Sequence, residues 1–156
     1  MLNRLAKLRE ERAADDKGFT LIELLVVVVI IGVLIAIAIP LYLNYKKGAN
    51  DKSAQSDLRN AVNVLEQCNT DNAAYPVNAD VPSAGGALGA SCTSQSINKS
   101  SGTAFTYFTV SGSDQTAYVM SAKNSNGSGK TYCYSSAAGG SVQTTATAVT
   151  AYRAAC

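Results

Sequence analysis

One carboxylate stands at the edge of a long uncharged segment of the sequence. From Leu24 to Leu43 the chain carries no charged residue, and Glu23 directly precedes this segment. Twenty helical residues span roughly 30 Å, which is the thickness of a bilayer core. A carboxylate costs about 2.5–3.5 kcal/mol at full depth in lipid, and less near the interface. We therefore expect Glu23 to have a partner that compensates its charge.

The other reactive side chains form no catalytic or metal-binding pattern. The chain has no histidine, no Cys-x-x-Cys motif and only scattered acids, so we expect no metal, no cofactor and no enzymatic activity. Asp71, Asp80 and Asp114 could help to bind calcium, but solvated loop carboxylates are the simpler interpretation. The net charge of +2 gives no electrostatic footprint for nucleic acid.

A short motif before the apolar segment resembles the processing site of type IV prepilins, and it reads Lys17-Gly18-Phe19-Thr20-Leu21-Ile22-Glu23. In that family a cytoplasmic aspartyl peptidase cuts after a glycine, and the new amino terminus is N-methylated. The resemblance implies cleavage between Gly18 and Phe19, with N-methylation of Phe19. Gly18 has no side chain, so a protease groove can approach the backbone closely. The resemblance is specific over residues 15–67, and the long charged leader and the number of cysteines depart from it.

The resemblance also assigns roles to residues inside the apolar segment. Glu23 fills the place of the family's glutamate. Its carboxylate can pair with the amino terminus of its own Phe19 or with that of a neighbouring subunit, because Phe19 and Glu23 lie one helical turn apart. The family favours the neighbour, and this pairing would set the axial register of an assembly. Gly32 and Pro40 match positions where the helices of the family loosen during assembly.

Two other interpretations of the apolar segment explain fewer of its residues. A secretory signal peptide would use Ala36-Ile37-Ala38 as a cleavage site, but this triplet lies inside the apolar run. A simple membrane anchor explains the length of the segment but not its processing motif. Five basic residues precede the segment and three lie within the first ten residues after it, so we expect a cytoplasmic leader. These residues are Arg4, Lys7, Arg9, Arg12 and Lys17 before it, and Lys46, Lys47 and Lys52 after it.

The helical pattern continues beyond the membrane-length segment. An apolar stripe at helical spacing consists of Ala54, Leu58, Ala61, Val62 and Leu65. No glycine or proline interrupts residues 49–67, and turn-forming residues follow at 68–72. We expect one helix over residues 19–67, membrane-spanning in its first half and amphipathic in its second. Asp57 is expected among the polar neighbours of the stripe.

The remainder of the chain predicts a small β-sheet head. Residues 77–103 are rich in Gly, Ala and Ser and are expected to form an irregular loop. Short alternating patterns predict strands over residues 104–110, 117–122 and 130–135, with a hairpin loop at 124–129. A weaker pattern at 142–150 indicates a fourth strand. An antiparallel sheet laid on the amphipathic half of the helix gives an α+β fold.

Four cysteines are expected to compensate for the small apolar core of the head. In an oxidising compartment they can form two disulfides, and three pairings are available. The locally closing pairing, Cys68–Cys92 and Cys133–Cys156, would pin the loop after the helix and tie down the C-terminus. Each link closes a loop of about 25 residues, worth roughly 3 kcal/mol in the chain-entropy model. The second link resembles the C-terminal disulfide loop of many pilins, and we expect this pairing.

The resemblance implies a structural subunit of a type IV pilus. Residues 1–18 would be a leader that is removed, 19–48 the membrane-spanning and filament-core half of the helix, 49–69 its amphipathic half, and 70–156 the head. The implied partners are further copies of the chain in a helical filament, the prepilin peptidase and methyltransferase, the pilus assembly machinery and, before assembly, the cytoplasmic membrane. The extracellular filament would serve adhesion, motility or DNA uptake. The alternatives are a pseudopilin of a type II secretion or competence system, and a membrane-anchored binding domain that does not polymerise.

Overall fold

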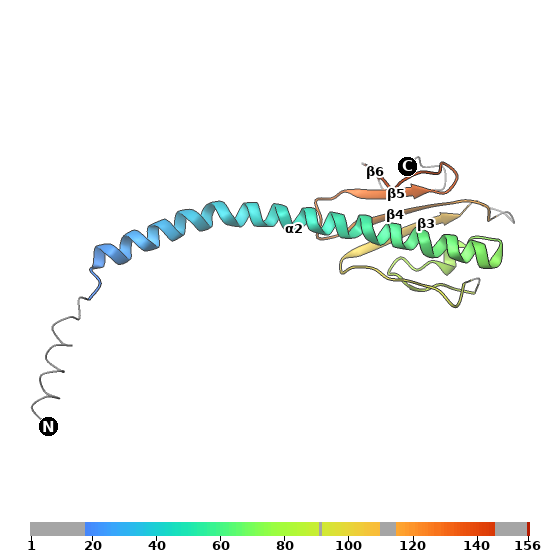
Figure 1. Cartoon of the computed structure of the whole chain (residues 1–156), viewed down its shortest axis with the longest axis horizontal. Coiled ribbons are helices and arrows are strands. Elements are labelled where there is room, and N and C mark those ends of the chain that lie inside the picture. The colour runs from blue at the N-terminus through green and yellow to red at the C-terminus, as the bar shows by residue number, and fades with distance from the viewer. Residues whose placement is uncertain (1–17, 91, 110–114, 146–155) are drawn as a thin grey trace, which may run out of the picture. The chain divides into compact units, whose positions relative to one another are not determined.

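The computed structural model describes residues 18–90, 92–109, 115–145 and 156 (Figure 1). The chain divides into two units, one up to Tyr42 and one from Leu43 onward. The long helix α2 (Leu21–Asn72) contributes to both. It is followed by the 3-10 helix η1 (Asn78–Asp80) and the strands β1 (Gly86–Ala87), β2 (Ser96–Ile97), β3 (Thr103–Thr109), β4 (Tyr118–Asn124), β5 (Thr131–Ser135) and β6 (Gln143–Thr145). One long helix with a small antiparallel sheet packed on its second half confirms the α+β prediction.

The unit from Leu43 onward, which we call the head unit, packs the amphipathic half of α2 along the sheet (Figure 1). The predicted apolar stripe lies on the packed face, because four of its five residues are fully buried and Val62 is partly buried against the core. Alternate residues of the strands point to this face, as the two-residue period of a strand requires. They place Phe105, Tyr107, Tyr118, Met120 and Tyr132 in the same core.

The strands β3, β4, β5 and β6 form an antiparallel sheet in sequence order. In its register Tyr107 lies opposite Met120, and Ser121 lies opposite Cys133. The three main predicted strands are confirmed to within two residues, and the fourth is present over Gln143–Thr145. Residues 110 and 146–150 of the predicted strands lie outside the described residues.

Asn124 extends β4 beyond its predicted end. Its side chain is buried, and Nδ2 donates hydrogen bonds to Ser101 O at 3.0 Å and to Thr103 Oγ1 at 3.2 Å. A residue type that favours turns is therefore held inside the sheet by partners on the neighbouring strand and loop, which the local sequence pattern does not reveal.

The helix ends later than predicted, at Asn72 instead of residue 67. Thr70 Oγ1 and Asn72 Nδ2 each donate, at 2.9 Å, to the backbone carbonyl four residues earlier. Such bonds let these residue types continue a helix, although they also favour turns. The helix stops at Ala73, whose φ of 57° is left-handed and whose amide donates to Asn69 O.

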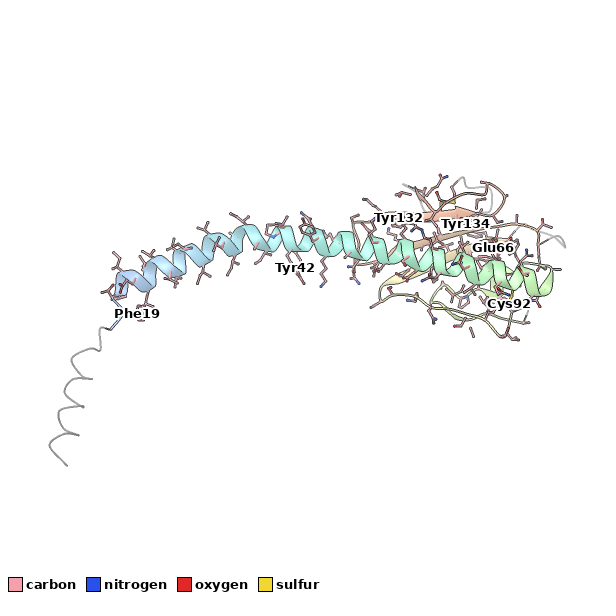
Figure 2. The ribbon with its side chains drawn as sticks, in the orientation of Figure 1. Phe19, Tyr42, Glu66, Cys92, Tyr132 and Tyr134 are labelled. Carbon is pink, nitrogen blue, oxygen red and sulfur yellow. A yellow bond between two sulfur atoms is a disulfide. The ribbon has the colours of Figure 1, made fainter. Side chains whose placement is uncertain are left out.

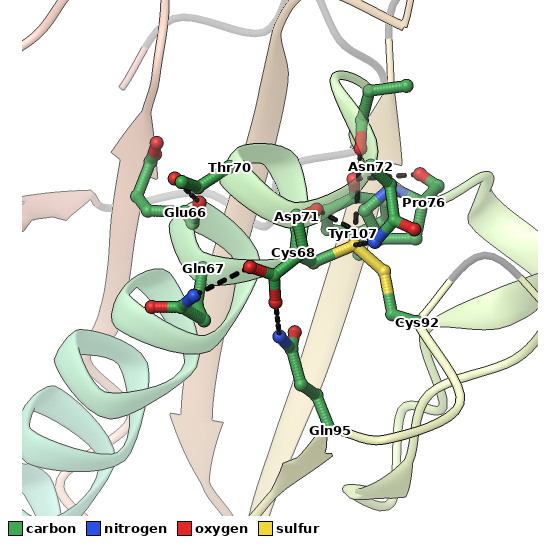
Figure 3. The surroundings of a disulfide bond; sticks show 11 residues. Glu66, Gln67, Cys68, Thr70, Asp71, Asn72, Pro76, Cys92, Gln95 and Tyr107 are labelled. Carbon is green, nitrogen blue, oxygen red and sulfur yellow. Dashed lines mark hydrogen bonds between the residues drawn. A yellow bond between two sulfur atoms is a disulfide. The ribbon is translucent and has the colours of Figure 1, made fainter.

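The segment predicted as an irregular loop contains short elements, since η1, β1 and β2 lie within it and β1 pairs with β2. A disulfide between Cys68 and Cys92 joins this segment to the last turns of α2, with the two Cα atoms 5.7 Å apart (Figure 3). Beside it, Asp71 accepts hydrogen bonds from Gln67 Nε2 at 2.9 Å and Gln95 Nε2 at 2.8 Å. Asp71 is solvated, as expected, but it is a helical residue and not a loop acid, and it holds the segment to the helix.

The second disulfide joins Cys133 of β5 to Cys156, with Cα atoms 5.6 Å apart. Cys133 is on the sheet face that points away from α2, where it clusters with Val119, Phe108 and Cys156. The chain end therefore packs on the face of the sheet that the helix leaves uncovered. The two links in the structure have the pairing that the sequence analysis expects.

Three carboxylates of α2 also hold separate parts of the head unit to the helix. Asp51 accepts bonds from the backbone N–H and the hydroxyl of Ser128. Asp57 accepts bonds from the N–H and the hydroxyl of Ser100 at 2.8 and 3.1 Å. Glu66 accepts bonds from two tyrosine hydroxyls, and all of these donors are neutral. Asp57, a polar neighbour of the apolar stripe, is itself buried, and its carboxylate is satisfied by these hydrogen bonds.

Candidate processing and assembly site

The predicted cleavage site lies outside the helix. Gly18, Phe19 and Thr20 precede α2 and are exposed, with 82% of Phe19 accessible. No described atom lies within 4 Å of the position that a Cβ on Gly18 would take. The bond between Gly18 and Phe19 is therefore in an open backbone segment. The predicted helix start at Phe19 is wrong for the intact chain, since the helix begins at Leu21.

Thr20 and Glu23 form a capping box that explains where the helix begins. The backbone N–H and the hydroxyl of Thr20 each donate to Glu23 Oε2 at 2.8 Å, and the Glu23 N–H donates to Thr20 Oγ1 at 3.3 Å. The carbonyl of Thr20 accepts the first helical bond, from Leu24 N. The box satisfies N–H groups that a helix start leaves unpaired. It also places a negative charge at the positive end of the helix dipole.

The partner of Glu23 in the intact chain is thus Thr20, which the sequence analysis missed. The expected partner, an amino terminus at Phe19, is absent from the intact chain. The Thr-x-x-Glu spacing just before an apolar run is the signal that would have identified the box. Because the Glu23 side chain is exposed, a second donor can reach its carboxylate.

The helix beyond this box has an apolar surface on every side. Every large apolar side chain from Leu21 to Leu43 exposes between 48% and 87% of its area, and Figure 2 shows these side chains pointing outward around the helix between Phe19 and Tyr42. The segment is long and apolar enough to cross a membrane. An unassociated chain would leave this surface in water, so it requires lipid or other protein around it.

Gly32 and Pro40 both lie inside this part of α2, and the helix continues through them. Nothing lies within 4 Å of the position that a Cβ on Gly32 would take. Pro40 has no N–H, so the carbonyl one turn earlier lacks its helical hydrogen bond. Loosening of the helix at these two positions during assembly stays a prediction.

The carboxylates considered for calcium do not gather into a site within the part of the chain that the structure describes. There, no group of three or more His, Cys, Asp or Glu side chains is arranged to hold a metal ion. Asp80 packs so closely on Gly89 that a Cβ at Gly89 would collide with its carboxylate. Asp114 lies outside the described residues.

The processing motif and the apolar segment match known proteins. Residues 14–39 match the family described as the prokaryotic N-terminal methylation motif. This range contains Gly18, Phe19, the Thr20–Glu23 box and Gly32. It ends one residue before Pro40, so the match covers the site and most of the membrane-length segment but not the head unit.

Curated relatives match longer stretches of the chain than this family does. The chain is 42% identical over 66 residues to type II secretion system core protein G of Escherichia coli, which covers 42% of this chain and 46% of the relative. It is 45% identical over 64 residues to the type IV wide pilus major component PilA4 of Thermus thermophilus, and this match covers 41% of this chain and 49% of the relative. It is 47% identical over 53 residues to the type IV major fimbrial protein FimA of Dichelobacter nodosus, covering 34% of each. The chain thus spans half or less of the length of these relatives, and no solved structure matches it.

Proposed function

Because the chain belongs to the type IV pilin and pseudopilin family, we propose that it is a structural subunit of a type IV pilus. In this proposal residues 1–18 are a cytoplasmic leader that prepilin peptidase removes after Gly18, and Phe19 is then N-methylated. Residues 19–48 hold the subunit in the cytoplasmic membrane, residues 49–69 pack on the head, and residues 70–156 form that head outside the cell. The assembly machinery transfers the subunit into an extracellular helical filament of identical copies.

The exposed apolar surface of α2 carries this proposal. Burying a large apolar side chain is worth about 1.5–3 kcal/mol, so covering the whole segment from Leu21 to Leu43 is worth tens of kcal/mol as an upper bound. A membrane supplies this cover before assembly. Helices of neighbouring subunits can replace the lipid, through a head-to-tail contact that does not close into a ring.

The capping box gives Glu23 a partner for the stage before cleavage. Removal of the leader would create an ammonium at Phe19, and a bond between an ammonium and a carboxylate is stronger than one from a neutral N–H or hydroxyl. We assign Glu23 the role of attracting the Phe19 ammonium of the neighbouring subunit. The exposed face of the carboxylate supports this role, because a group from another chain can approach it.

A second candidate within the family is a pseudopilin of a type II secretion system. The similarity to core protein G of Escherichia coli favours it, since the identity and coverage of that match are close to those of the PilA4 match. A membrane-anchored domain that never polymerises is the alternative from another class. It accounts for the apolar helix but leaves the processing motif without a purpose.

Substitution at the cleavage site tests the processing step. We expect Gly18→Val to leave the leader attached and to stop assembly, because a branched side chain blocks close approach to the backbone. Mass spectrometry of the membrane fraction should find wild-type chains that begin at a methylated Phe19 and variant chains that retain residue 18. A wild-type chain that begins after Ala38 would instead indicate a secretory signal peptide and contradict the proposal.

A further inference from the structure

A hollow lies in the head unit where the membrane-length part of α2 ends. Its volume is about 530 Å³. Leu43, Lys46, Lys47 and Asn50 of the helix line one side, and Ser101 and the turn over residues 125–127 line the other. Leu43 is the last aliphatic residue of the membrane-length segment, and the two lysines lie about one helical turn beyond it.

The hollow has two positive charges and no carboxylate in its lining. Lys46 and Lys47 are exposed, no carboxylate lines the hollow, and neither lysine has an ion pair or hydrogen bond with any described residue. The nearby carboxylate of Asp51 is buried and occupied by its two bonds from Ser128. By contrast, Lys52 further along the helix donates to Gln55 Oε1 at 3.4 Å. The ammonium groups of Lys46 and Lys47 are therefore available to a ligand in the hollow, whose other side is formed by Ser101 and residues 125–127.

Hydrogen bonds hold the loop wall of the hollow in place. Asn50 Nδ2 donates to Asn126 O at 2.9 Å, which fixes the turn to the helix. Ser125 N donates to Gly102 O at 2.9 Å, which fixes the turn to the neighbouring loop. Gly127 packs against Asp51 so closely that a Cβ there would collide with its carboxylate. A wall that is already ordered loses little entropy when it binds a ligand.

We propose that this hollow binds the phosphate headgroup of an anionic phospholipid while the subunit is in the membrane. Residues that follow a membrane span lie at headgroup depth, where lysines attract anionic lipid. The ammonium groups of Lys46 and Lys47 and the hydroxyls of Ser101 and Ser125 supply donors for phosphate oxygens. Leu43 supplies an apolar edge on the side where the acyl chains begin. The inference rests on the proposed membrane-inserted subunit, and the bound lipid would be released when the subunit enters a filament.

The test uses the full-length chain in nanodiscs of phosphatidylcholine with increasing amounts of phosphatidylglycerol. We expect the backbone amide signals of Ser101 and residues 125–127 to shift as the anionic lipid is added. Each lysine at the membrane surface contributes about five-fold to the affinity. The double variant Lys46→Gln/Lys47→Gln should therefore need about twenty-five-fold more phosphatidylglycerol for the same shift. The control Lys52→Gln/Lys123→Gln removes the same charge from positions outside the hollow and should respond like the wild-type chain.

Several results would overturn the inference. Equal weakening in the two double variants would mean that the membrane attracts the whole surface charge and not this hollow. The same shifts in phosphatidylcholine alone would show that the ligand is not an anionic headgroup. Equal shifts with inorganic phosphate at the same concentration would indicate a site for free small anions. A chain that does not stay in the nanodisc at any lipid composition would contradict the membrane-inserted subunit itself.

Discussion

Glu23 has a partner in the intact chain, and the proposed removal of residues 1–18 would give it another. In the intact chain the carboxylate accepts hydrogen bonds from the backbone N–H and hydroxyl of Thr20, so the charge beside the apolar segment is partly compensated. The proposed assembly step requires this carboxylate to exchange Thr20 for an ammonium. The sequence predicts that Glu23 needs a partner. The family resemblance indicates an amino terminus as this partner, whereas the structure shows Thr20.

Replacement of Glu23 separates insertion from assembly. We expect Glu23→Gln to insert and to be cleaved normally, because glutamine keeps the size and one acceptor of the capping box. Filament formation should fall by about ten-fold or more, since the lost charge attraction is strong in a low-dielectric bundle. The measurement is the ratio of filament to membrane-bound subunit, with Thr20→Ser as the control that keeps the box.

Co-expression gives a sharper version of this experiment. A Glu23→Gln subunit still has its own Phe19 ammonium, so it should enter mixed filaments with the wild-type subunit. If the variant assembles alone as well as the wild-type chain, the carboxylate acts only within its own chain and the intersubunit role is wrong.

Asp57 gives a second prediction at the scale of single residues. Asp57→Ala removes two hydrogen bonds to a carboxylate that is only 6% exposed. It should lower the free energy of unfolding by about 1.5–3 kcal/mol. The exposed carboxylate of Asp71 provides a matched control, because Asp71→Ala also removes two hydrogen bonds but leaves their donors accessible to water. Thermal unfolding, followed by near-UV circular dichroism, should show a larger loss of stability for Asp57→Ala than for Asp71→Ala. Equal losses of stability in the two variants would contradict the prediction.

The elements differ in how far their sequences predict them. The helix was predictable because its apolar run has the length of a membrane span and its stripe from Ala54 to Leu65 has the helical period. Its two ends were not, since both depend on side-chain bonds to the backbone, at Thr20 and at Asn72. The strands were predictable to within two residues from alternation. The short pair β1 and β2 was missed, because two-residue strands are too short to show a period.

A cluster of tyrosines between helix and sheet makes the head unit sensitive to alkali. The ring of Tyr118 contacts those of Tyr75, Tyr107 and Tyr134, with centroids 4.7, 5.5 and 5.8 Å away. Burial, together with Glu66, raises the pKa of Tyr75 to about 12. Burial also raises the pKa values of Tyr107 and Tyr118 well above the usual value.

The direction of these pKa shifts predicts how stability depends on pH. A tyrosine in the unfolded chain loses its proton near pH 10, whereas the folded head keeps it protonated at higher pH. The stabilisation is therefore complete below about pH 10 and is lost as the pH rises through the folded pKa values. We expect the free energy of unfolding to fall steadily above about pH 10, and Tyr118→Phe to make the fall shallower. A free energy that stays constant through this range would contradict the burial of the cluster.

The disulfides give the second prediction at the scale of elements. The links close segments with sequence separations of 24 and 23 residues, and each is worth roughly 3 kcal/mol in the chain-entropy model. Reduction should lower the melting temperature of the head while the N-terminal helix remains inserted in the membrane. Peptide mapping without reduction should recover Cys68 linked to Cys92 and Cys133 linked to Cys156. Recovery of alkylated Cys133 and Cys156 would show that the second link does not form in the cell.

At the scale of the whole molecule, the two units differ in how their roles can be inferred. The N-terminal segment has relatives among both pilus and secretion proteins, and its motif is sufficient to indicate the family. The matches to the relatives cover no more than 42% of the chain, and the fold of the β-sheet follows from strand patterns, disulfides and the carboxylates of α2. The difference between a pilin and a pseudopilin therefore rests on what the assembled subunits form, which the shared segment does not determine.

Mechanical shearing of the cell surface tests the central claim most directly. Filaments released from the surface are collected, and the N-terminal peptide of their subunits is determined by mass spectrometry. The proposed pilin predicts abundant sheared subunit that begins at a methylated Phe19. Subunit that begins at Phe19 but stays in the membrane fraction would indicate a pseudopilin, and an intact leader on all chains would contradict processing altogether.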